Sequence, residues 1–165
     1  TREKDVDVLS QSAQNIFFSG QFEILPPAVQ AVKTILEFYQ INPQSKKVAV
    51  FGQGLLVGQP VAFWLEKVGA DVCRIDEFTT YPENYSREAD IVISGVGKPE
   101  FISGDMIKDG ATIIDFGYEN KEGTMKGDFD FSSVSKKAGF ITPVPGGIGP
   151  VVVASVLKNL IELNK

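Results

Sequence analysis

The sequence contains no histidine and only one cysteine, Cys73, in 165 residues. The missing histidine removes the commonest general base and the commonest metal ligand, and with them the Ser-His-Asp and Cys-His forms of nucleophilic catalysis. A single cysteine allows no internal disulfide and no cysteine cluster for zinc. We therefore expect no metal site in this chain.

Positive charge and long apolar runs are scarce as well. Lys and Arg number 16 against 21 Asp and Glu, which gives a net charge of −5 and argues against a nucleic-acid surface. No signal peptide and no apolar run of membrane-spanning length is present, so we expect no membrane insertion and predict a cytoplasmic or organelle-matrix protein. The chain begins at Thr1 without a methionine, so we expect a processed protein or the excised part of a longer one.

The length and composition fit one domain with a docked flanking segment. Hydrophobic residues make up 43% of the chain and charged residues 22%, as in a globular protein. Residues 1–26 are poorly patterned, and we interpret them as an arm or linker that packs locally. We interpret residues 27–165 as the domain itself.

Residues 47–60 organise the rest of the chain. They open with an apolar strand, Val48 to Phe51, which we expect to be buried on both faces. Three glycines follow, Gly52, Gly54 and Gly58, and then the apolar face of a helix at residues 61–68. A strand, a glycine turn and a helix N-terminus form an anion site, where free backbone N–H groups hold a diphosphate. The glycine spacing is one residue looser than the common fingerprint, so a turn without a ligand is the alternative.

An acid follows the second expected strand, residues 71–75. Asp76 stands 24 residues after Gly52, where dinucleotide-binding sheets place the acceptor for the ribose hydroxyls. Glu77 is the second candidate, and an ordinary surface carboxylate is the alternative. A carboxylate at this place repels the 2′-phosphate of NADP, no Arg lies in residues 75–80, and Gln53 is neutral. The sequence therefore predicts NAD rather than NADP as the cofactor.

Strands and helices alternate along the remainder. We expect further strands at 89–94, 111–116 and 140–142, and helices at 27–39, 103–108 (capped by Ser103 and closed by Gly110) and 151–163. Residues 118–138 are expected to form a polar hairpin or loop, and residues 143–150 are too rich in Pro and Gly for regular structure. This order predicts an α/β fold with a doubly wound, Rossmann-like parallel sheet, an N-terminal arm and a C-terminal helix.

Several runs of sequence match a known family in its own order. They are residues 3–7, 57–60, 97–99 with 104–108, 114–117 and 141–150. On these runs the chain resembles the C-terminal two-thirds of the methylenetetrahydrofolate dehydrogenase/cyclohydrolase family. Enzymes of that family oxidise the methylene bridge of a folate by hydride transfer and then hydrolyse the product to 10-formyl-folate. The resemblance implies this function for the complete enzyme, with a folate as its substrate.

The resemblance also implies roles for single residues. Asp7 matches an acid that binds the pterin, and Tyr118 matches a residue that backs the cofactor. The cofactor itself is expected to contact Gly52, Gln53, Gly54, Asp76, Glu77 and Gly97. The loop at the folate and nicotinamide end is expected to include Pro143, Pro145, Gly146, Gly147 and Gly149.

The chain departs from the family in ways that bear on activity. Asp76 stands where the family has His, which fits a change of cofactor. The family's catalytic Lys, with a nearby Tyr and a Gln, lies in an N-terminal domain that precedes Thr1. We therefore expect this chain alone to be inactive. Two alternatives to the enzyme domain are an NAD-binding module or subunit without folate chemistry, and a structural remnant.

The last helix carries a broad apolar stripe, made of Val153, Val156, Leu157, Leu160 and Ile161. An uncovered stripe of this kind is a contact surface. We expect it to be covered by a second copy in a homodimer, by the arm, or by the missing N-terminal domain or a separate partner chain. The alternative is that it packs on this domain's own sheet.

Overall fold

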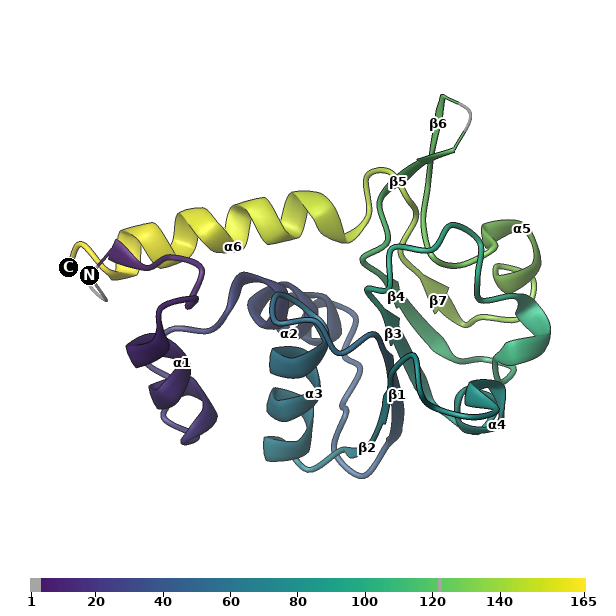
Figure 1. Cartoon of the computed structure of the whole chain (residues 1–165), viewed down its shortest axis with the longest axis horizontal. Coiled ribbons are helices and arrows are strands. Elements are labelled where there is room, and N and C mark those ends of the chain that lie inside the picture. The colour runs from purple at the N-terminus through teal and green to yellow at the C-terminus, as the bar shows by residue number, and fades with distance from the viewer. Residues whose placement is uncertain (1–3, 122) are drawn as a thin grey trace.

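The computed structural model of the chain describes residues 4–121 and 123–165. Five parallel strands form one sheet in the order β2-β1-β3-β4-β7 (Figure 1). Their bounds are Lys47–Phe51 for β1, Asp71–Ile75 for β2, Ile91–Ser94 for β3, Thr112–Asp115 for β4 and Phe140–Ile141 for β7. Strand order reverses between β1 and β3, because β2 lies on one side of β1 and the later strands lie on the other. The predicted doubly wound α/β fold is confirmed.

Helices cover both faces of this sheet. One face carries α2 (Pro27–Phe38) and α3 (Gly58–Lys67), with α6 (Ile148–Glu162) packed on α2, and the other carries α4 (Pro82–Ser86), the 3₁₀ turn η2 (Gly104–Met106) and α5 (Phe131–Val134). Alternate residues of β1 enter different cores: Val48 and Val50 pack toward α2 and α3, and Ala49 and Phe51 pack toward the opposite helices. This burial on both faces is the reason for the unbroken apolar run in β1.

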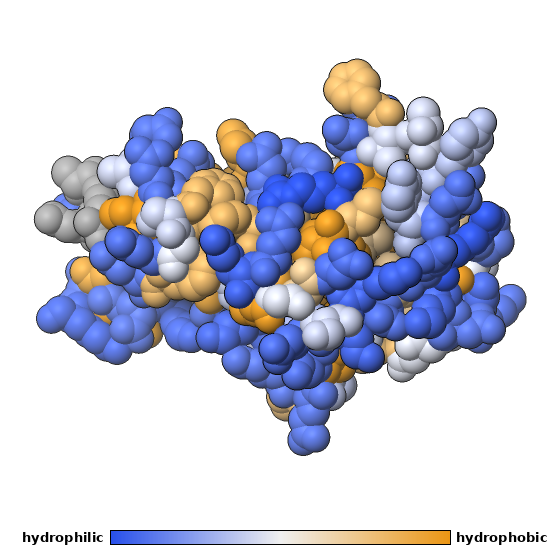
Figure 2. Space-filling model, turned by 90° about the horizontal axis from the view of Figure 1, so that it is seen from below, coloured by the Kyte–Doolittle hydropathy of each residue, from blue (hydrophilic) through white to orange (hydrophobic). Residues whose placement is uncertain are grey.

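Figure 2 shows one face of the molecule on which hydrophilic residues predominate and apolar residues gather toward the middle. Within the described residues, no helix is long and apolar enough to cross a membrane. The exposed apolar side chains include two on α6, Val153 and Ile161, each 62% exposed.

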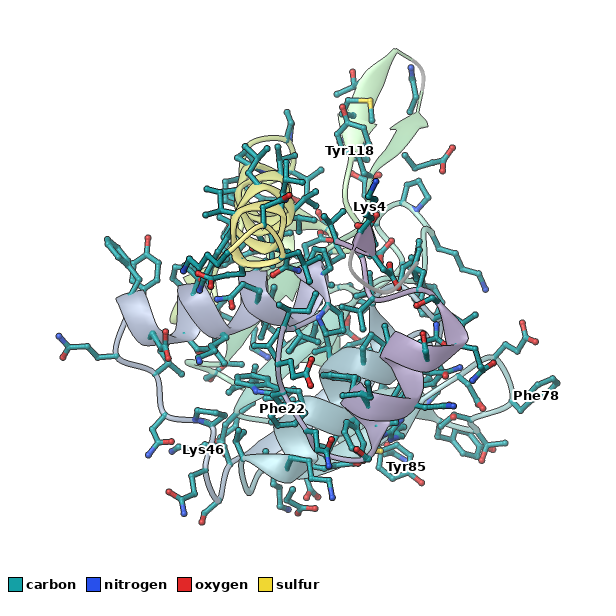
Figure 3. All side chains as sticks on the ribbon, turned by 90° about the vertical axis from the view of Figure 1, so that its left-hand side faces the viewer. Lys4, Phe22, Lys46, Phe78, Tyr85 and Tyr118 are labelled. Atoms are coloured by element: carbon teal, nitrogen blue, oxygen red, sulfur yellow. The ribbon has the colours of Figure 1, made fainter. Side chains whose placement is uncertain are left out.

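Part of the arm forms a helix that the sequence patterns did not predict, α1 (Gln11–Phe18). The Ser10 side chain caps it by accepting a hydrogen bond from the N–H of Ala13 over 3.4 Å. Phe17 is 2% exposed, and its ring meets that of Phe63 on α3 at a centroid distance of 5.4 Å. Figure 3 looks along α6 from the end where both termini lie and shows α1 beside α3. The arm therefore contributes to the core, while the division at residue 26 stays a prediction.

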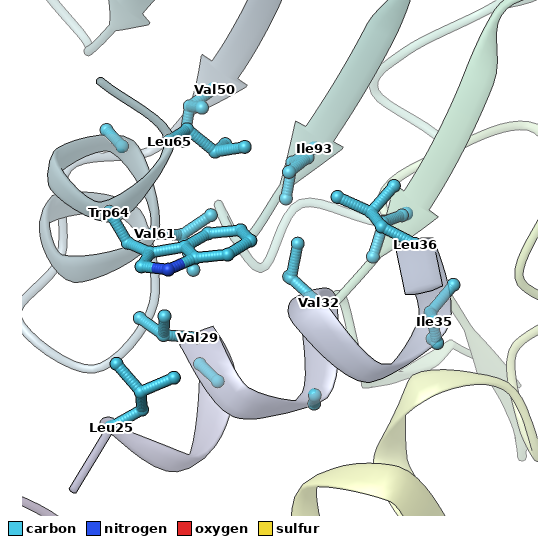
Figure 4. Packing of buried hydrophobic residues seen from close by; sticks show 14 of the residues in the cluster. Leu25, Val29, Val32, Ile35, Leu36, Val50, Val61, Trp64, Leu65 and Ile93 are labelled. Atoms are coloured by element: carbon cyan, nitrogen blue, oxygen red, sulfur yellow. The ribbon is translucent and has the colours of Figure 1, made fainter. Parts of the chain in front are cut away.

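The core between α2, α3 and the sheet is seen in Figure 4. The ring of Trp64 on α3 lies between the two helices, close to Val29 and Val32 of α2. Val50 and Ile93 meet the same cluster from β1 and β3. Burial of large side chains on this scale fixes α3 against the sheet, and with it the position of the α3 N-terminus.

The apolar face expected at residues 61–68 lies on α3, which begins at Gly58. Two other predicted helices had wrong bounds. Helix α6 begins at Ile148 rather than residue 151. Pro150 occupies the first turn of α6, where its missing N–H is not needed, so the Pro- and Gly-rich run does not delay the helix. The helix expected at 103–108 is only the turn Gly104–Met106, and Ser103 makes no capping bond because its hydroxyl bonds the Asp105 side chain instead.

A two-stranded antiparallel hairpin, β5 (Glu119–Lys121) and β6 (Thr124–Lys126), projects from the sheet between β4 and α5 (Figure 1). A hairpin or loop was expected over residues 118–138, and the hairpin occupies the first part of that range, whereas residues 131–134 form helix α5. After β6 the chain returns to the sheet, where Phe129 pairs with Ile102 in a single parallel bridge.

Candidate functional site

A cleft of about 520 Å³ opens at the carboxyl ends of β1, β2 and β3. Its walls include the turn after β1, the segment after β2 and the loop after β3, with residues 51–54, 75–79, Pro82, Gly95, Val96, Lys98 and Phe101. The strand order reverses between β1 and β3, and such reversals at the carboxyl edge of a parallel sheet are where α/β proteins bind ligands.

The turn after β1 requires glycine at two positions. Gly52 has a φ of +84°, and its N–H donates to the carbonyl of Ile75 over 2.8 Å, which joins the turn to the end of β2. At Gly58, a Cβ atom would lie 1.6 Å from the carbonyl oxygen of Gly52. Only glycine allows the first turn of α3 to approach the strand so closely.

This turn presents unpaired backbone donors. Within the described part of the chain, the N–H groups of residues 53–57 donate no hydrogen bond. A Cβ atom at Gly54 would meet nothing within 4 Å, so the space beside the turn is open. Free N–H groups at the positive end of a helix attract anions, and a diphosphate fits this arrangement.

Gln53 lies in the turn with its side chain fixed. Its Nε2 donates to the carbonyl oxygens of Val50 at 3.0 Å and Gly52 at 3.2 Å, and Gln59 Nε2 donates to the Gln53 carbonyl at 2.9 Å. Gln53 Oε1 is buried and has no partner among the described residues.

Asp76 lies at the end of β2, as predicted. Its Oδ1 accepts hydrogen bonds from Thr79 Oγ1 at 2.8 Å and from the N–H of Phe78 at 3.0 Å. The Thr79 hydroxyl lowers the pKa of the Asp76 carboxyl, and the Phe78 N–H lowers it further, so the group is ionised at neutral pH. Glu77 follows it along the cleft wall. These bonds leave Asp76 Oδ2 without a partner within residues 4–121 and 123–165.

The third wall is the loop after β3. Gly97 has a φ of +67° and is not among the lining residues, whereas its neighbours Val96 and Lys98 are. The Lys98 ammonium lies 5.6 Å from the ring centroid of Phe101, so a cation and an aromatic ring stand at the same wall. Neither had been identified from the sequence.

Two buried acids behind this loop were also missed. Asp115 and Asp128 are 3% and 1% exposed. Desolvation by burial raises the pKa of the Asp115 carboxyl to about 6; three backbone N–H groups oppose the rise and the nearby Asp128 carboxylate adds to it. An acid after Gly127 in a polar stretch was the available signal, but the partners of Asp128 lie about 30 residues earlier in the chain.

The other predicted site residues lie outside this cleft. Tyr118 is 66% exposed at the base of the β5–β6 hairpin, where Figure 3 labels it. Residues 143–149 follow β7 at the same sheet edge and lead into α6, and part of this loop lines a second hollow of about 370 Å³ with the C-terminal end of α2. A Cβ atom at Gly147 would lie 2.3 Å from the Pro143 carbonyl oxygen, so this turn also requires glycine.

Asp7 is exposed and lies beside α6 rather than beside the cleft. The carbonyl of its neighbour Val6 accepts a hydrogen bond from Asn159 Nδ2 at 2.8 Å. Asn159 stands eleven residues after Ile148, which is about 16 Å along the helix axis from the loop before α6. No group of three or more Cys, Asp or Glu side chains among the described residues has the arrangement of a metal site.

Comparison with known proteins places these features in one family. Residues 26–165 match the family model described as the NAD(P)-binding domain of tetrahydrofolate dehydrogenase/cyclohydrolase. The bifunctional protein FolD of Mycoplasmopsis synoviae is 44% identical over 170 residues, which cover 99% of this chain and 60% of that protein.

Solved structures agree. The bifunctional FolD enzyme of Campylobacter jejuni superposes with a TM-score of 0.94 at 34% identity, over 97% of this chain and 57% of that one. The Trypanosoma brucei enzyme, solved with NADP and an inhibitor, gives 0.91 at 33% identity over 99% and 59%. The NAD-dependent 5,10-methylenetetrahydrofolate dehydrogenase of Saccharomyces cerevisiae gives 0.80 at 25% identity over 99% and 62%. The chain thus spans between 57% and 62% of the length of these proteins.

Proposed function

Since the chain belongs to the tetrahydrofolate dehydrogenase/cyclohydrolase family, as its NAD(P)-binding domain, we propose that the cleft at β1, β2 and β3 binds NAD in preference to NADP. The complete protein acts as a methylenetetrahydrofolate dehydrogenase, with hydrolysis of the methenyl product as its second activity. The bound dinucleotide supplies the hydride acceptor for the first reaction. No comparison favours a dinucleotide-binding module without folate chemistry.

One observation supports the cofactor site above the others. Unpaired N–H groups at residues 53–57 and the free oxygen of Asp76 stand on adjacent strand ends, joined by the bond between Gly52 and Ile75. The N–H groups suit a diphosphate, and the Asp76 oxygen suits a ribose hydroxyl. A dinucleotide carries both chemical groups, at a separation that matches two neighbouring strands of a sheet. Glu77 and the glycine loop around Gly97 complete the walls that face the adenosine half.

The preference for NAD follows from the acid at the ribose end. Asp76 is an ionised carboxylate, which can accept a hydrogen bond from the 2′-hydroxyl of NAD and repels the 2′-phosphate of NADP, while Gln53 in the turn is neutral. Lys98 is the cation that lines this cleft, and it is the group on which NADP binding would depend. The yeast relative is named as NAD-dependent and the trypanosome relative was solved with NADP, so the family accommodates either cofactor.

The remaining roles belong to the folate end. Tyr118 lies after β4 and the loop of Pro143, Pro145, Gly146, Gly147 and Gly149 lies after β7, so both stand further along the same sheet edge. We assign Tyr118 to the back of the cofactor and the loop to the nicotinamide and folate. Asp7 contacts the pterin only when the N-terminal domain places a folate beside the arm.

Direct titration tests the cofactor proposal. NADH and NADPH are titrated separately into the 165-residue chain, and nicotinamide fluorescence reports the Kd for each. The Kd for NADH should be about tenfold lower than that for NADPH, which corresponds to one charge contact of 1.4 kcal/mol. Tighter binding of NADPH would show that the NAD preference is wrong and leave the site in place. If neither NADH nor NADPH binds, the proposal that this cleft is a dinucleotide site is wrong.

A second measurement tests the assignment of catalysis to the complete protein. The 165-residue chain should oxidise no methylenetetrahydrofolate in the presence of NAD, because the chain contains no histidine and spans only 57% to 62% of the length of the relatives that carry this activity. Turnover proportional to the amount of this chain would show that its own residues suffice for the chemistry.

A further inference from the structure

Asp128 lies behind the cleft wall and accepts hydrogen bonds with both carboxylate oxygens. Its Oδ2 accepts from Ser94 Oγ at 2.7 Å and from the N–H of Val96 at 2.8 Å. Its Oδ1 accepts from the N–H of Lys98 at 2.9 Å. The residue is 1% exposed, so these bonds form away from bulk water, where charge-assisted hydrogen bonds are strong.

Two of these bonds hold the backbone of the cleft loop. Val96 and Lys98 both line the cleft, and Gly97 between them has the positive φ that lets the two N–H groups point to the same carboxylate. Asp128 itself is not among the lining residues. Asp128 can therefore affect the cleft only through the conformation of the loop that it holds.

The position requires a carboxylate. An ionised Asp is an acceptor at both oxygens, whereas Asn presents one acceptor and one donor. Because N–H groups approach Asp128 from Val96 on one side and Lys98 on the other, an Asn would satisfy one and face the other with a donor. A buried N–H left without an acceptor is costly, so one end of the loop would move.

Asp128 is itself held in place. Its N–H donates to Asp115 Oδ1 at 3.0 Å, and its carbonyl accepts from the N–H of Ile102 at 2.9 Å. A Cβ atom at Gly117 would lie 2.5 Å from Asp128 Oδ1, so glycine there makes room for the carboxylate. The side chain has a defined place before any ligand arrives.

We propose that Asp128 is a positioning residue for the dinucleotide, because it fixes residues 96–98 in the conformation that receives the cofactor. This inference rests on the proposed function of the cleft. It predicts that a variant without two acceptor oxygens at position 128 binds the dinucleotide more weakly even at temperatures where the variant is fully folded.

The test compares Asp128→Asn with Ser94→Ala. Both variants remove a hydrogen bond at the same carboxylate, but Ser94→Ala leaves both backbone N–H bonds of the loop intact. Both should lower Tm. Asp128→Asn should raise the Kd for NADH about tenfold, whereas Ser94→Ala should leave it at the wild-type value, measured by nicotinamide fluorescence well below either Tm.

A measurement on the unaltered chain applies even if Asp128→Asn does not fold. Before ligand is added, amide hydrogen exchange at Val96 and Lys98 should be as slow as in β3, because the loop is already held. Exchange at the rate of an open loop would overturn the inference.

The remaining outcomes separate this inference from the function on which it rests. A folded Asp128→Asn variant with the wild-type Kd for NADH overturns the inference and leaves the cleft as the cofactor site. Equal weakening by Ser94→Ala also overturns it, because that result would assign the effect to general loss of packing. Failure of the wild-type chain to bind NADH overturns both.

Discussion

The N–H of Asp128 donates to Oδ1 of Asp115 over 3.0 Å, so two buried acids from the sheet and from the segment after β6 share one hydrogen-bond network. Asp115 ends β4 and also accepts from the N–H groups of Gly117 and Phe129. Asp128 in turn holds the loop after β3. The pair therefore connects β4, the base of the hairpin and the cofactor cleft.

Asp115 gives stability a pH dependence with a definite sign. Its pKa is about 6 in the folded chain against an ordinary value of 3.8, so the folded state binds this proton more tightly than the unfolded state. The stabilisation is complete below pH 3.8 and is lost as the pH rises toward 6. Between pH 4.5 and 7 this group alone should lower the free energy of unfolding by about 2 kcal/mol.

Asp115→Asn isolates that contribution. The other shifted carboxylates, including Asp76 and Asp90, have lowered pKa values and stabilise the chain as pH rises, and they are the same in both proteins. The difference in unfolding free energy between wild type and Asp115→Asn, from urea titrations across this pH range, should therefore shift against the wild type as pH rises. A constant difference would show that Asp115 titrates at an ordinary pKa.

Asn159 on α6 should contribute more to the free energy of unfolding than the exposed polar residues near it on the chain. Its Nδ2 donates to the carbonyl oxygens of Val6 and Leu25, both at 2.8 Å, and so ties the two ends of the arm to the helix. Asn159→Ala leaves both carbonyls without this donor and should cost about 2 kcal/mol of unfolding free energy. Asn164→Ala removes an exposed bond to Leu160 and is the control, with little effect on Tm. Equal effects would contradict the role of Asn159.

Substitution by Ala should have different effects at two glycines of the cleft turn, lowering stability at one and weakening NADH binding at the other. Gly58→Ala places a methyl group against the Gly52 carbonyl and should destabilise the chain by about 3 kcal/mol or more, because backbone must move. Gly54→Ala meets nothing within 4 Å and should keep the wild-type Tm, yet it adds a methyl group to the cleft and should weaken NADH binding. A variant at Gly54 that binds NADH as wild type would place the diphosphate elsewhere.

The sequence predicted what depends on local patterns. Buried strands appear as apolar runs, and parallel strands bring their carboxyl ends together, so Gly52 and Asp76 could be placed at one edge from spacing alone. Helix α1 could not, because its stability comes from Phe17 packing on α3 rather than from a long periodic face. Asp128 could not, because its carboxylate acts on Val96 and Lys98, which are close only after folding.

The apolar stripe of α6 is exposed in the structure, and the partner that covers it stays a prediction. Leu157 and Leu160 are 55% and 48% exposed, so neither the arm nor the sheet covers them, while Ser155 and Asn159 are buried on the same helix. We expect a second copy to cover the stripe when this chain is alone in solution. Leu157→Lys should weaken self-association about tenfold in sedimentation equilibrium, with an unchanged Tm at concentrations where both proteins are monomers.

The control for that experiment is Gln44→Lys, which adds the same charge at an exposed loop far along the chain from α6. It should leave the association constant unchanged. Monomers at every concentration for wild type and variant would show that copies of this chain do not meet through the stripe. A lower Tm for Leu157→Lys at a concentration where both proteins are monomers would assign the residue to the core instead.

Cofactor choice should depend on the charge of Asp76 rather than on the shape of the turn that it forms. In Asp76→Asn, the side-chain oxygen still accepts from the N–H of Phe78 and from Thr79 Oγ1, so the turn persists, while an amide N–H₂ replaces the free carboxylate oxygen. The change removes repulsion of the 2′-phosphate and adds a donor to it, so the Kd for NADPH should fall about tenfold relative to that for NADH. Glu77→Gln removes a neighbouring charge from the same cleft wall and is the matched control. If both variants shift the ratio of the two Kd values equally, the effect comes from the overall charge of the cleft, and Asp76 is not the residue that selects the cofactor.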